Sequence, residues 1–413
     1  MPAVDTHSLS DIEGAVPRKG TRTGFTTGAC AAAAARAAVL GLLCGQVPGE
    51  IESLLPNGQR VRFAVHASGC DAAAQTAHAA IVKFAGDDPD CTDGAHITAT
   101  VRVLPGQAGQ VIYRAGEGVG TVTLPGLGLQ VGGPAINPVP RANIAANLHE
   151  AAPELLAAHG LEVTVSVPGG EVMARKTTNA RLGILGGISI LGTSGIVRPY
   201  STSAWRASVV QGVQVAATLG HGLVALTTGG RTETFAMRLL QAERPGLPLT
   251  CFVQMGDFLR YALDECVAQG IRQVVLGVMV GKLTKIAQGE TITHANRNVV
   301  DTDLVARVAR RIGASQADCQ AIAEAKTARF GADLLTSRGL GAAFHAALAQ
   351  EAIATLTAPE RYGRAFELRV LVSDPAGQLV ADERSAPADD RPLPPTAGRT
   401  GIGHTHSADF DTD

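Results

Sequence analysis

The sequence predicts a two-domain α/β (α+β) protein, in which an N-terminal mixed α/β domain precedes a Rossmann-like parallel α/β domain. Its 413 residues, 46% of them hydrophobic, are enough for more than one core, because domains hold about 100 to 200 residues. Aromatic residues make up only 4% and glycines number 48, so Ala, Val, Leu and Ile must build the cores on closely spaced backbone. From Leu223 onward, strand and helix patterns alternate with short links, which indicates right-handed crossovers and a parallel sheet.

The N-terminal domain is expected over residues 20–170, after a flexible arm at residues 1–19. Its first helix lies in RTGFTTGACAAAAARAAVLGLL, where an alanine run of high helix propensity follows the capping residues Thr26 and Thr27. Pro56-Asn57-Gly58 then separates two strand patterns and indicates a hairpin. The other elements expected here are an alanine-rich helix over 70–84, a strand over 96–104, a helix over 143–159 and a strand over 161–167.

A glycine-rich segment, RKTTNARLGILGGISILGTSGIVRPYS, runs from Arg175 to Ser201. Each of its five glycines would cost a helix roughly 1 kcal/mol relative to alanine, and glycine lets the backbone turn sharply or approach another group closely. We expect this segment to form the crossover that opens the second domain, residues 171–300. The alternative to a segment that approaches a ligand is a tightly packed inter-domain crossover whose arginines, at its ends, are solvated.

In the second domain, strands are expected over 223–227, 249–254 and 272–280, with helices over 234–242 and 258–268 between them. A preceding helix places Trp205, Val209 and Val213 on one apolar face. Helical segments over 301–313, 316–330 and 331–355 and closing strands from 365 are expected within residues 301–383. The proline, aspartate and threonine content of residues 384–413 indicates a disordered tail.

Charge and cysteine usage exclude several function classes. The formal net charge of −2 argues against a non-specific nucleic-acid or membrane-surface partner. Seven scattered cysteines without a Cys-x-x-Cys pair indicate reduced thiols, and the N-terminus lacks the apolar core of a secretory signal, so we expect a cytoplasmic protein. The alanine run contains Arg36 and the other long apolar run is the glycine-rich segment, so neither is expected to span a membrane. The oligomeric state is left open between a monomer and a homo-oligomer.

Two places in the first half of the chain favour anions. The glycine-rich segment contains the cations Arg175, Lys176, Arg181 and Arg198 and no acid, so the object that its backbone approaches is expected to be anionic. The turn of Thr26, Thr27 and Gly28 leads into a helix N-terminus, where free N–H groups and the helix dipole favour an anion. The alternative for this turn is a well-capped, tightly packed core helix, with Cys30 either reactive or a small apolar filler.

Residues that follow the three predicted parallel strands form a third candidate site. Ligands of such sheets lie outside the carboxyl ends of the strands, where glycines allow close approach and an acid can hold the two hydroxyls of a ribose. The residues concerned are Gly229, Gly230, Arg231, Glu233, Gly256, Asp257, Gly281, Lys282 and Lys285. Lys282 and Lys285 share a face on a helical turn and, with Arg231, favour a carboxylate or phosphate. A nucleotide-like ligand is therefore predicted at this edge.

No convincing metal site emerges from the sequence. There is no His-x-x-x-His with an acid and no cluster of cysteines. Asp87, Asp88, Asp90 and Asp93 lack the ligand spacing and closing glutamate of a calcium loop, so an aspartate-rich turn is the expected interpretation.

The chain resembles one family in several long blocks that occur in one order. The blocks are RTGFTTGACAAAAARAA, GDDPDCTDG, GEGVGTVTLPGL with PAINPVPR, KTTNARLGILGGISILGTSGIVRPYS, TTGGRTE, VQMGDF and GKLTKIAQG, followed by Thr293-His294. They are similar to the cobalt-precorrin-5B (C-1)-methyltransferases of anaerobic cobalamin biosynthesis, the CbiD family, over roughly Arg22 to Asp382. The sequence departs from the family at Leu124, where a lysine is expected, and at Ala180, where a proline is expected.

The resemblance implies transfer of a methyl group from S-adenosylmethionine to C-1 of a cobalt-bearing tetrapyrrole macrocycle, cobalt-precorrin-5B, to give cobalt-precorrin-6A. The donor is then expected at Gly229, Gly230, Arg231, Glu233, Gly256 and Gly281. The acidic macrocycle is expected at Thr26, Thr27, Gly28, Arg175, Lys176, Arg181, Arg198, Lys282 and Lys285. The cobalt arrives within the substrate, so no protein-bound metal is required, and Asp257 and His294 are candidates for a base if a proton must leave. A non-catalytic carrier of anionic tetrapyrroles is the alternative.

Overall fold

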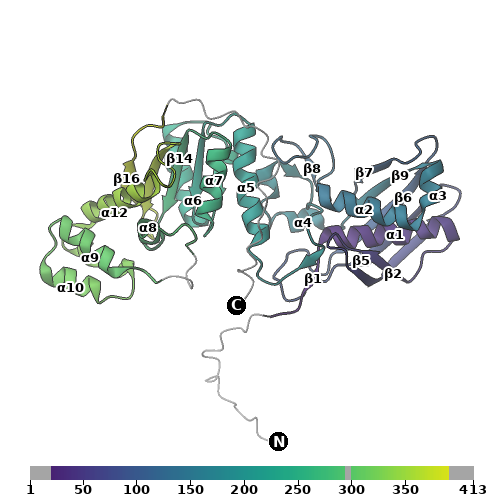
Figure 1. Ribbon diagram of the computed structural model, residues 1–413, viewed down its shortest axis with the longest axis horizontal. Coiled ribbons are helices and arrows are strands. Elements are labelled where there is room, and N and C mark those ends of the chain that lie inside the picture. The colour runs from purple at the N-terminus through teal and green to yellow at the C-terminus, as the bar shows by residue number, and fades with distance from the viewer. Residues whose placement is uncertain (1–19, 294–298, 390–413) are drawn as a thin grey trace, which may run out of the picture. The chain divides into compact units, whose positions relative to one another are not determined.

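The computed structural model describes residues 20–293 and 299–389, which form two compact units that divide between Thr202 and Ser203 (Figure 1). The expected arm and most of the expected tail lie outside the described residues. Unit 1 ends at Thr202, and unit 2 begins at Ser203. The glycine-rich segment therefore folds with unit 1, whereas the sequence-based division placed it at the start of the second domain.

Unit 1 is built on a sheet with strand order β4-β5-β6-β9-β7, in which all neighbours are antiparallel except β9 and β7. The strands are β4 (Ala67–Asp71), β5 (Thr76–Val82), β6 (His96–Leu104), β9 (Gly160–Ser166) and β7 (Val111–Ala115). The predicted hairpin is present as β2 (Glu50–Leu54) and β3 (Arg60–Ala64). The helices after β8 (Thr121–Val122) are α2 (Pro138–Ala151), α3 (Pro153–Ala158) and α4 (Gly170–Ala174), with a 3-10 turn at Asn179–Leu182.

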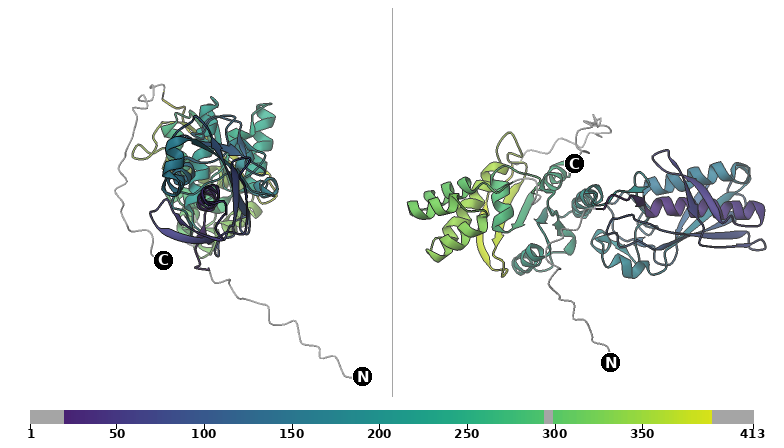
Figure 2. Two further views of the ribbon diagram at one scale, coloured as in Figure 1. Left: turned by 90° about the vertical axis from the view of Figure 1, so that its right-hand side faces the viewer. Right: turned by 90° about the horizontal axis from the view of Figure 1, so that it is seen from below.

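Helix α1 (Thr27–Cys44) forms the centre of the unit 1 core. Its alanines from Ala29 to Ala35 are fully buried, and their small side chains let α2, β5 and β6 approach closely. Figure 2 shows α1, in purple, running alongside α2. Among the described residues, α1 is the one helix that is long and apolar enough to cross a membrane by length and composition, and 72% of that window is buried inside the protein. Where α1 packs against α2, the Arg36 guanidinium forms an ion pair with Glu150 of α2 at 3.0 Å.

The expectation of an alanine-rich helix over residues 70–84 was wrong, because this stretch forms the end of β4, a turn and β5. Ala77, Ala79 and Ile81 face the core on alternate positions of β5, and Ala80 between them is also buried. Small side chains are needed there because α1 packs directly against β5. Tertiary packing thus overrides the helix propensity of alanine.

The glycine-rich segment is held to unit 1 by short antiparallel pairs at both ends. β10 (Ile184–Leu185) pairs with β8 (Thr121–Val122), and β11 (Ile196–Val197) pairs with β1 (Gly24–Phe25). Between them, Ile188 and Ile190 are buried and form isolated bridges with Val119 and Ile136. The middle of the segment is therefore a packed part of the unit 1 core.

Unit 2 contains the predicted parallel sheet, with strand order β13-β12-β14-β15-β16. The strands are β12 (Leu223–Thr227), β13 (Phe252–Gln254), β14 (Gln273–Val278), β15 (Glu367–Ser373) and β16 (Leu379–Arg384), and only β16 is antiparallel to its neighbour. The helices of the alternating part are α5 (Ser203–Thr218), α6 (Gly230–Glu243), α7 (Leu259–Ala268) and α8 (Val280–Ala287). This confirms the predicted α/β class.

The two faces of the unit 2 sheet bury different helices. Leu223, Ala225 and Val275 pack with α6, whereas alternate residues such as Val224 and Leu276 pack with α5, α7, α8 and α12. The C-terminal helices are α9 (Thr302–Arg311), α10 (Gln316–Ala323), α11 (Ala328–Ser337) and α12 (Gly341–Leu356). The helix expected over 316–330 is broken where Thr327 caps α11. Because β15 pairs with β14, residues 301–383 complete the same sheet and do not form a separate part.

Arg369 of β15 joins three elements on the α6 face of this sheet. Its guanidinium makes bonds of 2.6 and 2.7 Å to Glu243 at the end of α6, and of 2.6 and 2.7 Å to Asp382 of β16. The Arg369 side chain is only 8% exposed. The hydrogen bonds from Arg369 lower the pKa of Glu243, so this carboxylate stays a charged partner of the buried cation.

Candidate functional site

The carboxyl edge of the unit 2 sheet contains a topological switch point. From β12 the chain passes through α6 to β13 on one side, while β14 lies on the other side of β12 and leads away from it toward β15. The chain therefore leaves β12 and β14 in opposite directions along the sheet. Open parallel sheets bind their ligands at such a point.

Three glycines at this switch point have no structural need to be glycine. Gly229 and Gly230 follow β12, and Gly281 lies in the first turn of α8. None has a φ in the left-handed region, and a Cβ added to any of them would meet no atom within 4 Å. Neither backbone conformation nor packing requires glycine here, and the exposed backbone can instead be approached by a ligand.

Lys282 joins the loops that end the parallel strands. Its Nζ lies 2.9 Å from Asp257 Oδ1, 3.2 Å from the carbonyl oxygen of Gly256 and 3.3 Å from that of Thr228. An ammonium group has three protons, and here each has an acceptor. The prediction that Lys282 and Lys285 lie on a helical turn is confirmed by α8. However, Lys282 bonds to the protein itself, and Lys285 is only 6% exposed. We therefore assign both lysines to the framework of the edge.

Asp257 is an acceptor in the same cluster. The hydroxyl of Thr293 donates to Asp257 Oδ1 at 3.2 Å, and the Thr293 N–H donates to the Asp257 carbonyl at 3.1 Å. Within the described part of the chain, both Lys282 and Thr293 use Oδ1, which leaves Oδ2 for a hydroxyl group of a ligand. His294, the other candidate for a base, lies outside the described residues.

The two other predicted side chains at this edge differ in exposure. Arg231 is exposed in the first turn of α6. Glu233 is only 3% exposed and accepts a 2.6 Å hydrogen bond from Gln254 at the end of β13. Glu233 therefore ties α6 to β13, and Asp257 is the acid that is accessible to a ribose.

Trp205 also lies at this edge of the sheet, a position that the sequence did not predict. Periodicity placed it on the apolar face of α5 with Val209 and Val213, which are buried, but Trp205 itself is 47% exposed. It lies in the first turn of α5, against Gly256, whose φ is +59°. A Cβ on Gly256 would lie 3.2 Å from the indole Nε1. A helical period identifies a face, but it does not show how far the first turn extends past the sheet.

The polar groups of the turn from Thr26 to Gly28 are used within unit 1, which favours the alternative of a well-capped core helix over a substrate site. The Gly28 N–H donates to the carbonyl of Leu191 at 3.0 Å, and the Ala29 N–H donates to Thr26 Oγ1 at 3.2 Å. Thr27 Oγ1 accepts the Leu191 N–H at 2.9 Å. Thr26 and Thr27 are 7% and 4% exposed, so the glycine-rich segment covers the helix start. Burial raises the pKa of Cys30 to about 12, which makes it a filler and not a reactive thiol.

Three of the four cations of the glycine-rich segment lie on the surface of unit 1. Arg175, Lys176 and Arg198 are exposed, and Arg181 is half-buried. Leu185 and Leu191 of the same segment are 51% and 43% exposed. The segment thus presents large apolar side chains together with positive charges, a combination suited to a flat apolar ring that carries carboxylates.

The aspartate-rich loop binds the protein itself. Asp87 pairs with Arg22 at 2.9 Å, Asp90 pairs with the buried Lys83 at 2.7 Å, and Asp88 accepts the Tyr200 N–H at 2.8 Å. Asp93 accepts the Ala85 N–H at 2.7 Å. In residues 20–293 and 299–389, no group of three or more His, Cys, Asp or Glu side chains could hold a metal ion.

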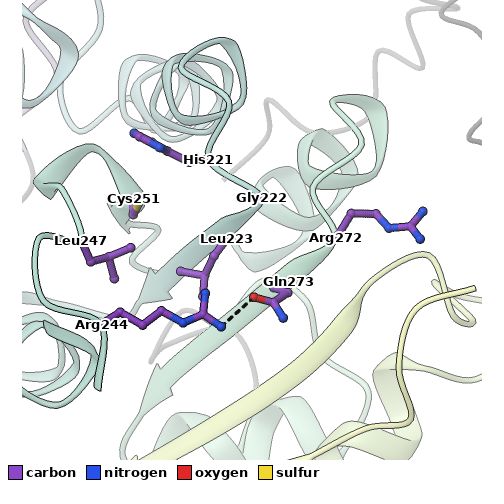
Figure 3. Close-up of a pocket in the computed structure, with 8 residues that line it drawn as sticks. All are labelled: His221, Gly222, Leu223, Arg244, Leu247, Cys251, Arg272 and Gln273. Carbon is purple, nitrogen blue, oxygen red and sulfur yellow. Dashed lines mark hydrogen bonds between the residues drawn. The ribbon is translucent and has the colours of Figure 1, made fainter. Parts of the chain in front are cut away.

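A pocket of about 380 Å³ opens at the opposite, amino-terminal edge of the unit 2 sheet. It is lined by His221, Gly222, Leu223, Arg244, Leu247, Cys251, Arg272 and Gln273. Figure 3 shows the Arg244 guanidinium directed at Gln273, to which it donates at 3.1 Å, while the Arg272 side chain extends away from the pocket. Since parallel sheets bind ligands at their carboxyl ends, we give the switch-point edge precedence.

Comparison with known proteins places the chain in a family. Residues 15–199 match the family model described as CbiD, and residues 292–384 match the model described as CbiD, C-terminal domain. A cobalt-precorrin-5B C(1)-methyltransferase of Paracidovorax citrulli (strain AAC00-1) is 68% identical over 371 residues, which cover 90% of this chain and 98% of that protein. The chain belongs to the CbiD family. The switch-point strands β12, β13 and β14 of this CbiD protein lie between the two matched regions.

A further relative of this CbiD protein carries the same name. The cobalt-precorrin-5B C(1)-methyltransferase of Variovorax paradoxus (strain S110) is 65% identical over 364 residues, which cover 88% of this chain and 98% of that protein. Among solved structures, the crystal structure of the cobalamin biosynthesis protein CbiD from Archaeoglobus fulgidus is 28% identical and covers 64% of this chain and 79% of that chain, with a TM-score of 0.35.

Proposed function

We propose that this chain is a cobalt-precorrin-5B C(1)-methyltransferase. It transfers the methyl group of S-adenosylmethionine to C-1 of cobalt-precorrin-5B, giving cobalt-precorrin-6A in anaerobic cobalamin biosynthesis. The observation that carries this proposal is the 68% identity to a relative of that name, which this chain matches over 98% of the relative's length. The resemblance of the sequence blocks supports the same activity.

The donor site is assigned to the switch-point edge of unit 2. The bare backbone at Gly229, Gly230 and Gly281 leaves room for the methionine end of the donor, and Asp257 Oδ2 is placed to accept a ribose hydroxyl. Lys282 holds Asp257 and the two neighbouring loops in register. We therefore assign Asp257 to donor binding, and His294 stays a candidate for a base.

The methyl group of a sulfonium is already activated, so the main task of the protein is to align the ring carbon with the S–CH3 bond. Heavy acid–base machinery is not obligatory. Methyl transfer leaves the sulfur electron pair on S-adenosylhomocysteine and forms a new C–C bond at C-1. The cobalt belongs to the substrate, and no step here uses a metal held by the protein.

The macrocycle site is assigned to the glycine-rich segment of unit 1. The acetate and propionate groups of the substrate match Arg175, Lys176 and Arg198, and the apolar ring matches the exposed Leu185 and Leu191. Leu124, which stands where a family lysine is expected, supplies no cation. We place the enzyme in the cytoplasm, since all seven cysteines are free thiols.

The direct test incubates purified protein with labelled S-adenosylmethionine and cobalt-precorrin-5B under anaerobic conditions. We expect a product heavier by one methyl group, with one S-adenosylhomocysteine formed per product. No transfer with authentic substrate would overturn the proposal. The alternative, a non-catalytic carrier of anionic tetrapyrroles, predicts that the macrocycle binds while calorimetry detects no binding of the donor.

A further inference from the structure

We propose that Trp205 forms one wall of the donor site and stacks on the adenine of the bound donor. This inference rests on the proposed function, because it requires an adenosyl donor at the carboxyl edge of unit 2. It concerns a residue outside the strand-end glycines and acids, contributed by the helix that precedes the sheet.

The indole lies directly against the loop that carries Asp257. From the position of a Cβ on Gly256, Nε1, Cε2 and Cζ2 of Trp205 lie 3.2, 3.7 and 3.9 Å away. The carbonyl of the same Gly256 accepts a hydrogen bond from Lys282 at 3.2 Å. Trp205 therefore packs against Gly256, the residue directly before Asp257, whose carbonyl bonds to Lys282. The absence of a side chain at position 256 allows the indole to come this close.

Docking of α5 does not explain why a tryptophan lies here. Val209, Val213 and Ala216 are at most 2% exposed and fasten the helix to the sheet, whereas Trp205 is 47% exposed. The chain contains a single tryptophan, and it places this side chain at the edge of the candidate site with half of its surface in solvent. An accessible indole face is a stacking surface for any purine.

The order of features along the edge favours adenine over the macrocycle. The bare glycines lie at the switch point between β12 and β14, while Asp257 and Gly256 follow β13, on the far side of β12. A donor with its sulfonium end at the glycines reaches the β13 loop with its ribose. The base attached to that ribose then lies beside the residue that packs on this loop, which is Trp205.

Because the chain has one tryptophan, its fluorescence reports on this position alone. The full-length protein is titrated with S-adenosylhomocysteine, 5′-methylthioadenosine, adenosine or methionine, with fluorescence and calorimetry in parallel. We expect the three adenine-containing probes to quench the emission, with the same Kd as in calorimetry. Methionine is expected to leave the emission unchanged.

Two substitutions test the stacking directly. Trp205→Ala should weaken S-adenosylhomocysteine binding about 5- to 150-fold, the range found when an aromatic side chain that stacks on a base is removed. Trp205→Phe should retain most of the affinity because it keeps a ring. Phe330→Ala is the matched control, since Phe330 of α11 is 46% exposed in the same unit, and it should bind the donor like the wild type.

The outcomes separate this inference from the proposed function. If S-adenosylhomocysteine binds by calorimetry without quenching, and Trp205→Ala binds it like the wild type, the inference is overturned and the function stands. If the macrocycle quenches the emission and the adenine probes do not, Trp205 belongs to the substrate site and the inference is again overturned. Absence of donor binding in every assay would overturn the function as well. The wild-type titration needs no variant to fold.

Discussion

Lys282 Nζ lies 2.9 Å from Asp257 Oδ1, and this ion pair connects the first turn of α8 to the loop after β13. The same ammonium reaches the Thr228 carbonyl, directly after β12. One side chain therefore links the ends of two neighbouring strands to the helix that follows a third. The relative positions of these loops at the switch point therefore depend on Lys282, whose ammonium group contacts protein atoms.

Lys282→Met is expected to lower both stability and donor affinity. It leaves the Asp257 carboxylate and two carbonyls without their donor, and an unmade bond at a partly buried acceptor costs about 1–3 kcal/mol. The measurements are chemical denaturation and calorimetry with S-adenosylhomocysteine. Lys176→Met, which removes an exposed lysine of unit 1, is the control and should change neither quantity. Wild-type donor affinity in Lys282→Met would contradict the framework role.

Gly230→Ala and Gly281→Ala are expected to weaken donor binding without lowering stability. A Cβ meets no protein atom at either position, so the folded state gains or loses little, and alanine at a compatible site stabilises by about 0.4–1 kcal/mol. In the complex, the methyl group occupies ligand space and costs about 1–3 kcal/mol of binding free energy. Gly222→Ala, equally open but at the amino-terminal edge, is the control. Unchanged donor affinity in both edge variants would remove the site from this edge.

Arg175→Gln and Arg198→Gln are expected to weaken macrocycle binding and leave donor binding unchanged. Both side chains are exposed, so each charge contributes about 0.5–1 kcal/mol, or roughly two- to five-fold in Kd, and less at high salt. Titration of the macrocycle at two salt concentrations measures the effect. Arg62→Gln, an exposed arginine of β3, serves as the control. Equal losses in all three variants would indicate a general charge effect and no specific site.

The ion pair of Lys83 and Asp90 is expected to make stability depend on acidic pH. Burial raises the pKa of Asp90, but hydrogen bonds from Lys83 and Thr92 outweigh it, and the net pKa lies below the usual value of about 3.9. Its contribution to stability is thus complete above about pH 4 and is lost as the pH falls through the lowered pKa.

Asp90→Asn measures this contribution. It leaves Lys83, 1% exposed, without its charge partner, and we expect a loss of about 3 kcal/mol in unfolding free energy near neutral pH. The difference from the wild type should shrink below about pH 4. Glu360→Gln, at an exposed position, should follow the wild-type curve. A difference that stays constant down to acid unfolding would show that the ion pair is not its source.

Thiol labelling of the native protein is expected to separate the cysteines by burial. Cys44 and Cys70 are exposed and should react first, with Cys91 slower. Burial raises the pKa of Cys30 to about 12 and that of Cys251 to about 11, so these two should react only after unfolding. Mass spectrometry of timed samples locates each label. Rapid native labelling of Cys30 would show that the helix start is open.

The parallel sheet of unit 2 could be predicted because its strands are continuous apolar runs that end at glycine. The β12 range matches the prediction residue for residue, and the edge residues followed from the rule for parallel sheets. The turn at Thr26 could not be assigned, because its use is decided by Leu191, 164 residues from Thr27 in the chain. Local sequence is compatible with both a cap and an anion site, and the tertiary partner favours the cap.

The prediction of a helix over residues 70–84 was wrong for a related reason. Their alanines favour a helix locally, but here they serve as small side chains under α1. The exposure of Trp205 was also hidden, because it depends on where the first turn of α5 lies relative to Gly256. Composition and period indicate elements and faces, and the contacts between distant segments decide what each face is used for.

The burial of α1 also has a consequence during synthesis. α1 ends at Cys44 and β9, which completes the central part of its sheet, ends at Ser166, so 122 residues (166 minus 44) are made in between. At about 5–20 residues per second, the ribosome needs roughly 6 to 25 s for this stretch. During that time a helix apolar enough for a membrane has no finished core to enter. Alanine has a smaller apolar surface than leucine, so the composition that permits tight packing in the finished protein also limits aggregation of the unfinished chain.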